Sequence, residues 1–177
     1  MKDIFEGTFW QKVTDPIFID QNEKFFKKLI TNNTIFDNQA IEELAWIVVP
    51  FSDEFDYVHS LPKTLGGSTE GWIYATAVGF KEYIKLEFSP LALLKFEKSI
   101  GLLDVIFFDA AKTFILLVTP DYVLLAGNET TVKKIIGGND IKLSFTSFKD
   151  YAALFQEFDR LHEKLMKIYE IYKRFSC

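Results

Sequence analysis

The chain has 177 residues, of which 49% are hydrophobic and 25% are charged, and its formal net charge is −5. This length suffices for one domain with a sizeable core, and the composition excludes a disordered chain. No apolar run approaches the ~18 residues that a membrane span needs. We therefore expect a single α+β domain over residues 1–177 in a soluble, cytoplasmic protein without a membrane partner.

The acidic residues are concentrated in the first part of the chain. Residues 1–70 contain six Lys and twelve Asp or Glu, whereas residues 71–177 contain fourteen Lys or Arg and thirteen acids. An acidic surface repels nucleic acid and attracts basic proteins, so we expect a basic protein partner and no nucleic acid. The alternative is that the acids serve only solubility. Cys177 is the only cysteine, which leaves no disulfide within the chain and fits a reducing compartment.

Residues 1–19 read as irregular or partly extended, with acids where a secretion signal would be apolar. Asp20 with Glu23 three positions later has the spacing of a capping box, and it predicts a helix that runs to about Thr31. Asp37 or Asn38 can cap a second helix. Residues 46–49 (WIVV) fit either the last turn of that helix or a short strand.

Pro50 is expected to end whichever element precedes it. Ser52 can cap a short helix that stops before Pro62, and a polar, Gly-rich loop follows. Two strands, Trp72–Phe80 and Tyr83–Ser89, then form a hairpin. Ser89 followed by Pro90 is a strong helix start, and Gly101 ends that helix.

Three β-strands follow one another directly in the middle of the chain: Leu103–Phe108, Thr113–Thr119 and Tyr122–Ala126. The polar break at 109–112 and the turn at Pro120–Asp121 are too short for crossover helices, so the three strands are antiparallel neighbours. The middle strand is apolar on both faces. It is therefore expected at the centre of the core, with both faces covered.

The last part of the chain is predicted to be mainly helical. Asn128 caps a helix over Glu129–Ile136, and the alternating segment 141–145 (IKLSF) reads as an edge strand. A long helix should run from Ser147 to about Lys173, roughly 40 Å at ~1.5 Å per residue. Its apolar stripe comprises Tyr151, Leu154, Phe158, Leu161, Leu165, Ile168, Tyr172 and Phe175. The fold class is therefore α+β, an antiparallel sheet of five to six strands with this long C-terminal helix packed on one face.

A partner-binding site is predicted in the segment Phe51–Leu61. Asp53, Glu54, Phe55, Asp56 and Tyr57 mix aromatic rings with carboxylates. Rings supply buried contact area and carboxylates orient a basic partner, so this turn is our candidate contact surface. The alternative is an ordinary amphipathic turn with Phe55 directed inward.

No catalytic, metal or cofactor site is predicted. The loop Gly66–Gly71 (GGSTEG) lacks the second Gly of a nucleophile elbow and the Lys of a phosphate loop. Asp53, Asp56 and His59 could share one side of a helix as metal ligands, but spacings of three are common in acidic turns. His162 is followed by Glu163 without a second His. We therefore expect a binding protein rather than an enzyme.

Residues Val105–Ile136, with FFDAAK, TPDY and LAGN, resemble small bacterial proteins that include immunity proteins encoded beside polymorphic toxins. That resemblance implies a cytoplasmic protein that binds a cognate toxin by presenting acids to a basic surface. The leading hypothesis is thus an immunity protein that neutralises a toxin. Two alternatives remain: a small hydrolase with a dispersed site near Asp53, His59 and Gly66–Gly71, and a homodimeric structural protein joined through the C-terminal helix.

Overall fold

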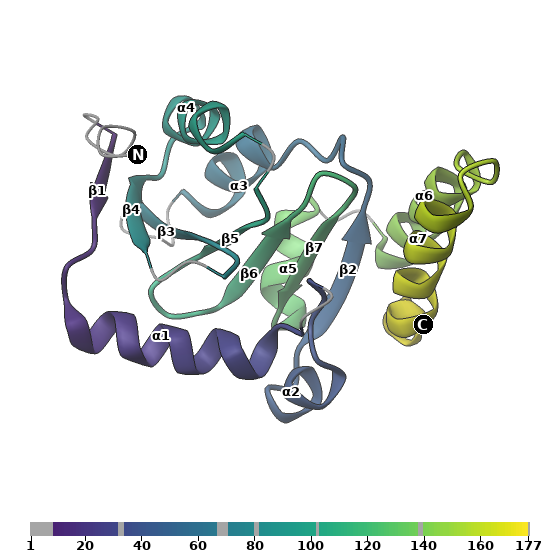
Figure 1. Cartoon of the computed structure of the whole chain (residues 1–177), viewed down its shortest axis with the longest axis horizontal. Helices are drawn as coiled ribbons and strands as arrows, with labels where there is room; N and C mark the ends of the chain where they lie inside the picture. Colours follow the sequence, from purple (N-terminus) through teal and green to yellow (C-terminus); the bar gives the residue numbers. More distant parts are fainter. Residues whose placement is uncertain are drawn as a thin grey trace.

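The computed structural model describes residues 9–31, 34–66, 71–79, 82–101, 103–137 and 140–176. Within these ranges, seven strands form one antiparallel sheet in the order β1-β4-β3-β5-β6-β7-β2 (Figure 1). The strands are β1 (Trp10–Lys12), β2 (Ile47–Phe51), β3 (Trp72–Ala77), β4 (Tyr83–Glu87), β5 (Val105–Phe108), β6 (Phe114–Val118) and β7 (Val123–Gly127). The α+β class is confirmed, but the sheet has more strands than the five to six predicted.

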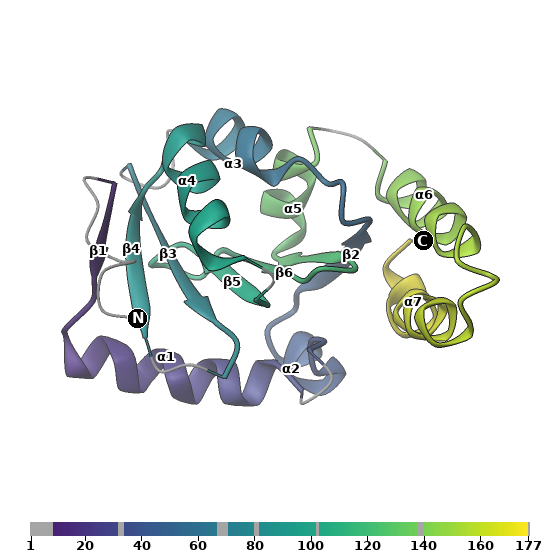
Figure 2. The same cartoon turned by 45° about the horizontal axis from the view of Figure 1, so that its top comes forward.

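Helices cover both faces of the sheet and one of its edges. They are α1 (Pro16–Leu29), α2 (Asn38–Glu43), α3 (Tyr57–Leu65), α4 (Pro90–Ile100), α5 (Glu129–Ile135), α6 (Ile141–Ala153) and α7 (Asp159–Tyr172), with a 3-10 turn at Lys173–Ser176. Figure 2 shows α1 beneath the sheet and α3, α4 and α5 above it, while α6 and α7 stand beside β2. No helix in the described ranges is long and apolar enough to cross a bilayer.

The three central strands are confirmed as predicted. β5 pairs with β6 and β6 pairs with β7, all antiparallel. Neighbouring side chains on β5 point to opposite faces: the ring of Phe108 lies 4.9 Å from that of Phe26 on α1, and the ring of Phe107 lies 5.9 Å from that of Phe96 on α4. The core therefore lies on both sides of these strands, and this two-sided cover explains why they are apolar throughout.

The first helix begins earlier than predicted. Asp15 caps α1, with Oδ1 accepting from the backbone N of Ile17 at 2.9 Å, and Pro16 occupies the first helical position. The predicted cap, Asp20, instead lies inside the helix and pairs with Lys24 at 2.7 Å. The second helix is confirmed, with Asp37 as its cap.

Residues 46–49 fall largely in a strand, and Pro50 does not end it. Pro50 lies inside β2, paired with Leu124 of β7. β2 is the last strand of the sheet, and proline is tolerated there because an edge strand has one side without ladder partners. The expectation that Pro50 terminates the element was therefore wrong.

The short helix after β2 also differs from its prediction. Asp56, not Ser52, caps α3 by accepting from the backbone N of His59 at 3.2 Å. The helix then continues through Pro62 to Leu65 instead of stopping before the proline. The hairpin of β3 and β4 and the helix capped by Ser89 agree with the predictions. Most of the Gly-rich loop, residues 67–70, lies outside the described ranges, as does Cys177.

The largest correction concerns the C-terminal helix. Residues 141–145 are not an edge strand but the first turns of α6, because Asp140 caps a helix there, with Oδ1 accepting from the backbone N of Lys142 at 2.9 Å. The single long helix is instead two helices that fold back on each other and pack against the β2 edge. Two residues of the predicted stripe are consequently exposed: Leu154 is 76% exposed and Phe158 is 64% exposed.

The fold-back is stabilised by contacts that a sequence pattern does not show. Phe145, Phe148 and Ala152 are buried from α6, while Leu165, Ile168 and Tyr172 are buried from α7. The hydroxyl of Tyr172 donates to the backbone O of Phe36 at 2.8 Å. Each helix therefore has its own apolar stripe, and both stripes are buried near β2.

Candidate functional site

The predicted partner-binding turn lies between β2 and α3. Asp53, Glu54 and Asp56 are exposed, and Asp56 also caps α3. The ring of Phe55 stacks on that of Phe51, with centroids 4.1 Å apart and planes 18° apart. The turn therefore presents three carboxylates to solvent beside a stacked pair of rings.

Tyr57 belongs to the core rather than to the partner surface. It is 4% exposed, and its ring lies 5.6 Å from that of Phe107. Burial raises the pKa of its hydroxyl, and the nearby charge of Glu97 raises it further. Of the five residues predicted to bind a partner, Tyr57 is thus the one that the fold withdraws from solvent.

A groove of about 360 Å³ opens between this turn and α6, and we call it the turn groove. Glu54 lies on its rim, and Leu143, which is 58% exposed, lies on the opposite side. The remaining lining residues are Phe51, Ser52, Phe55, Ile136, Ser144, Ser147 and Phe148. The α6 residues were missed because 141–145 was predicted as a strand. The cap at Asp140 is the sequence signal that could have revealed them.

A row of aromatic rings leads from the turn groove to the end of the helical hairpin. Phe148 contacts Tyr151 at 6.1 Å between centroids, Tyr151 contacts Phe155 at 5.2 Å, and Phe155 contacts Phe158 at 6.4 Å. The hydroxyl of Tyr151 donates to the backbone O of Asp121 at 2.9 Å. The row starts at a fully buried ring and ends at an exposed one.

The end of this row is the hairpin tip, residues 154–158, and it is held in place by hydrogen bonds. The backbone N of Phe158 donates to the O of Phe155 at 2.8 Å, and the backbone N of Leu154 donates to the O of Tyr151 at 3.1 Å. Nδ1 of His162 lies 2.9 Å from the O of Ala152, joining the two helices below the tip. The exposed side chains of the tip are thus carried on an ordered turn.

Tyr151, three residues before the tip, lies near the acidic turn, which we define as Asp53–Tyr57. Burial raises the pKa of the Tyr151 hydroxyl, and Asp53 raises it further through a hydrogen bond and its negative charge. The carboxylate of Asp53 therefore lies close to the aromatic row. We call the acidic turn, the turn groove and the hairpin tip together the acidic–aromatic surface.

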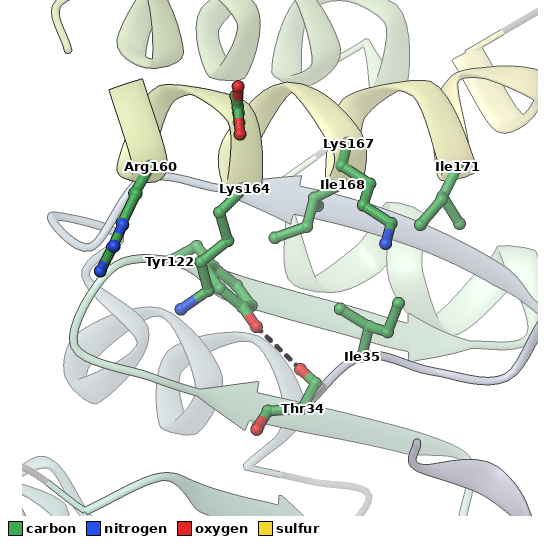
Figure 3. A pocket seen from close by; sticks show the side chains of 9 residues that line it. Thr34, Ile35, Tyr122, Arg160, Lys164, Lys167, Ile168 and Ile171 are labelled. Carbon is green, nitrogen blue, oxygen red and sulfur yellow. Dashed lines mark hydrogen bonds between the residues drawn. The ribbon is translucent and has the colours of Figure 1, made fainter. Parts of the chain in front are cut away.

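A second groove, of about 490 Å³, lies between α7 and the segment that carries Thr34 and Ile35, and we call it the α7 groove (Figure 3). Arg160, Lys164 and Lys167 extend into it from α7. Tyr122 forms its floor, where the hydroxyl donates to the backbone O of Thr34 at 2.8 Å. Sequence reasoning missed this groove, because its two walls are far apart in the chain.

The residues considered as metal ligands or hydrolase residues do not form a site in the described part of the chain. His59 is exposed, and it lines neither of the two grooves above nor a third one between α1 and β3. Within the ranges that the structure describes, no group of three or more His, Cys, Asp or Glu is placed to hold a metal ion. Asp53, Asp56 and His59 are accordingly not assembled as ligands.

Comparison with known proteins gives no match to a family model, to a curated protein or to a solved structure. The function is therefore argued from the surfaces described above.

Proposed function

We propose that this chain is a non-enzymatic protein-binding protein, namely an immunity protein that binds and neutralises a toxin domain with a basic surface. The observation that carries the proposal is the acidic–aromatic surface, where exposed carboxylates lie beside a groove lined by apolar side chains and serines and near an exposed, hydrogen-bonded tip. The resemblance of Val105–Ile136 to immunity proteins supports the same reading. So does the excess of acids in residues 1–70.

The carboxylates of the acidic turn are exposed, although Asp56 also caps α3 and Asp53 interacts with Tyr151. Asp53, Glu54 and Asp56 form no ion pair within the part of the chain that is described, whereas Asp121 pairs with Lys164 at 2.7 Å and Glu129 with Lys133 at 2.5 Å. Unpaired carboxylates beside one another repel, and a cationic partner relieves that repulsion. They would also accelerate encounter with a basic protein.

The hairpin tip supplies the apolar part of the contact. Leu154 is 76% exposed and Phe158 is 64% exposed, and moving each from water into a partner's pocket would contribute about 1–2 kcal/mol. Because the tip is already ordered by hydrogen bonds, little conformational entropy is lost when it binds. An ordered aromatic side chain next to polar groups is the usual composition of an interface hot spot.

The geometry gives less support to the two alternatives. A homodimer through the C-terminal helix would need the apolar stripe of α7, but Leu165, Ile168 and Tyr172 are already buried within the chain. The tip alone is too small for a stable dimer, which buries roughly 1,200 Å² or more in total. A hydrolase site around His59 would need a groove that holds this residue, and His59 lines none of the three grooves described above.

The test is calorimetric titration with the product of the adjacent gene, the protein that an immunity function would make its partner. Asp53→Asn/Glu54→Gln should weaken binding about tenfold through lost charge complementarity. Leu154→Ser/Phe158→Ser should weaken it at least about 30-fold. The control Glu43→Gln/Glu87→Gln changes two exposed acids elsewhere and should bind like the wild type.

All four proteins should unfold at similar temperatures, because the substituted side chains are exposed. The proposal fails if the wild-type chain does not bind that product. It also fails if both double variants bind as tightly as the control.

A further inference from the structure

Three cations from one helix line the α7 groove, and the protein-binding function proposed above gives them no role. Arg160, Lys164 and Lys167 recur at spacings of four and three residues, which places them on one side of α7. In Figure 3, Lys164 extends past Tyr122 and Lys167 extends toward Ile35, while Arg160 lies at the end of the groove nearer Tyr122. The adjacent stripe of α7 is buried, so these cations lie along the margin between core and solvent.

The floor of this groove is apolar and already satisfied in its hydrogen bonds. Tyr122 is fully buried, and its hydroxyl is used by the backbone O of Thr34. Ile35, Ile168 and Ile171 supply aliphatic surface beside its ring. Ile35 and Ile171 are only partly buried, so a ligand on this floor would meet their hydrocarbon rather than free polar groups.

The wall opposite α7 is held in one conformation. Thr34 has a φ of 56°, a left-handed value that is uncommon for a β-branched residue. Its backbone N donates to the O of Thr31 at 3.0 Å, and its hydroxyl donates to Oδ2 of Asp104 at 3.1 Å. These bonds fix the carbonyl that receives the Tyr122 hydroxyl, so the groove is formed before any ligand arrives.

The charges of the groove are not balanced by one another. Lys164 is neutralised by Asp121 at 2.7 Å, and its ammonium also lies 5.0 Å from the centre of the Tyr122 ring. Arg160 and Lys167 have no ion-pair partner among the residues described. Glu163, whose carboxylate also lines the groove, has none among them either. Asp104 is engaged by Thr34. Two unpaired cations thus lie beside one unpaired carboxylate, above an apolar floor.

We propose that the α7 groove is a binding site for a small organic anion with an apolar body. A carboxylate, sulfonate or phosphate of such a ligand would accept a hydrogen bond from Arg160 or from Lys167. Its aromatic or aliphatic body would lie on the partly exposed Ile35 and Ile171, above the buried Tyr122 and Ile168. The volume of about 490 Å³ is within the range of small-molecule sites, roughly 300–1,000 Å³. This site is separate from the acidic–aromatic surface and does not depend on the function proposed above.

The test uses anilinonaphthalene sulfonate, an aromatic monoanion whose fluorescence rises in apolar surroundings. It should bind the full-length chain saturably, and the amide resonances that shift should be those of Thr34, Ile35, Tyr122 and residues 160–171. Arg160→Gln/Lys167→Gln should weaken binding about tenfold. Lys28→Gln/Lys98→Gln removes the same charge from two exposed positions outside the groove and should change affinity by less than about twofold.

A third variant separates the apolar contribution from the charge. Ile171→Ser leaves every cation in place and should still weaken binding several-fold, because it removes part of the apolar surface. The proposed site would be overturned if the amide resonances shifted only in other regions. It would also be overturned if the Arg160/Lys167 variant and its control bound the dye with equal affinity. Displacement of the dye by an equal concentration of inorganic phosphate would show that the cations act alone, and it would overturn the assignment of an organic ligand.

Discussion

The turn between β5 and β6 offers the sharpest test of how the core is held together, and Asp109 is the residue to change. Asp109 is 6% exposed, and its carboxylate bonds across the turn. Oδ1 accepts from the backbone N of Thr113 at 2.7 Å and more weakly from that of Phe114 at 3.4 Å. Oδ2 accepts from the hydroxyl of Thr113 at 3.0 Å. One side chain therefore fixes the entry to the central strand.

The expected loss of stability follows from these bonds. A hydrogen bond to a charged group contributes about 1.5–3 kcal/mol net, and removing the acceptor also leaves donors without a partner. Water can reach half-buried Thr113 and recover part of the loss. Asp109→Ala should therefore destabilise the fold by about 3 kcal/mol. Asp109→Asn keeps one acceptor and should cost about 1 kcal/mol.

Urea unfolding and thermal denaturation measure this effect. For a chain of this size, ~3 kcal/mol corresponds to a fall in Tm of about 6–12 °C. The control Asp150→Ala alters an exposed carboxylate and should change stability by less than about 0.5 kcal/mol. If Asp109→Ala unfolds at the same temperature as this control, the bonds across the turn do not stabilise the core and the reasoning is wrong.

Two further predictions concern packing and pH. Gly127→Ala should destabilise by about 1–3 kcal/mol in urea, because the added Cβ would lie 2.6 Å from the backbone O of Thr113; an unchanged midpoint would contradict this close approach. Burial, and then the charge of Glu23, raise the pKa of Tyr83 from 10.0 to about 12. Since the unfolded state loses this proton first, the contribution of Tyr83 to stability is complete below pH 10 and is lost as pH rises toward 12. Circular dichroism should show weakening stability in that interval, and Tyr83→Phe should reduce the dependence.

The elements that could be predicted from the sequence are those with local causes. The turn between β6 and β7 is one example: the hydroxyl of Thr119 accepts from the backbone N of Asp121 at 3.2 Å and from that of Tyr122 at 3.1 Å. Pro120 presets the same turn. The start of α1 was equally readable, because Asp15 followed by Pro16 repeats the signal that located α4. The sequence therefore contained the signal for the correct start of α1.

Other features were hidden because distant contacts decide them. The apolar spacing from Tyr151 to Phe175 alternates three and four across the hairpin tip, so it cannot distinguish one helix from two. The sequence around Pro50 does not indicate that its strand lies at the edge of the sheet. For the candidate sites, the acidic turn could be predicted because its residues are consecutive. The hairpin tip and the α7 groove could not, since both arise from the fold-back of α7.

The same fold-back supports the binding role proposed for the tip. β2 is an edge strand, and an uncovered edge can pair with other chains, so α6 and α7 protect the sheet by packing against it. That protection depends on side chains such as Phe148 and Leu165, which are buried. Leu154 and Phe158 take little part in it, because most of each side chain is in water. Polar residues at both positions would preserve the cover of β2 and improve solubility, so a contact outside this chain is the simplest physical reason for their apolar character.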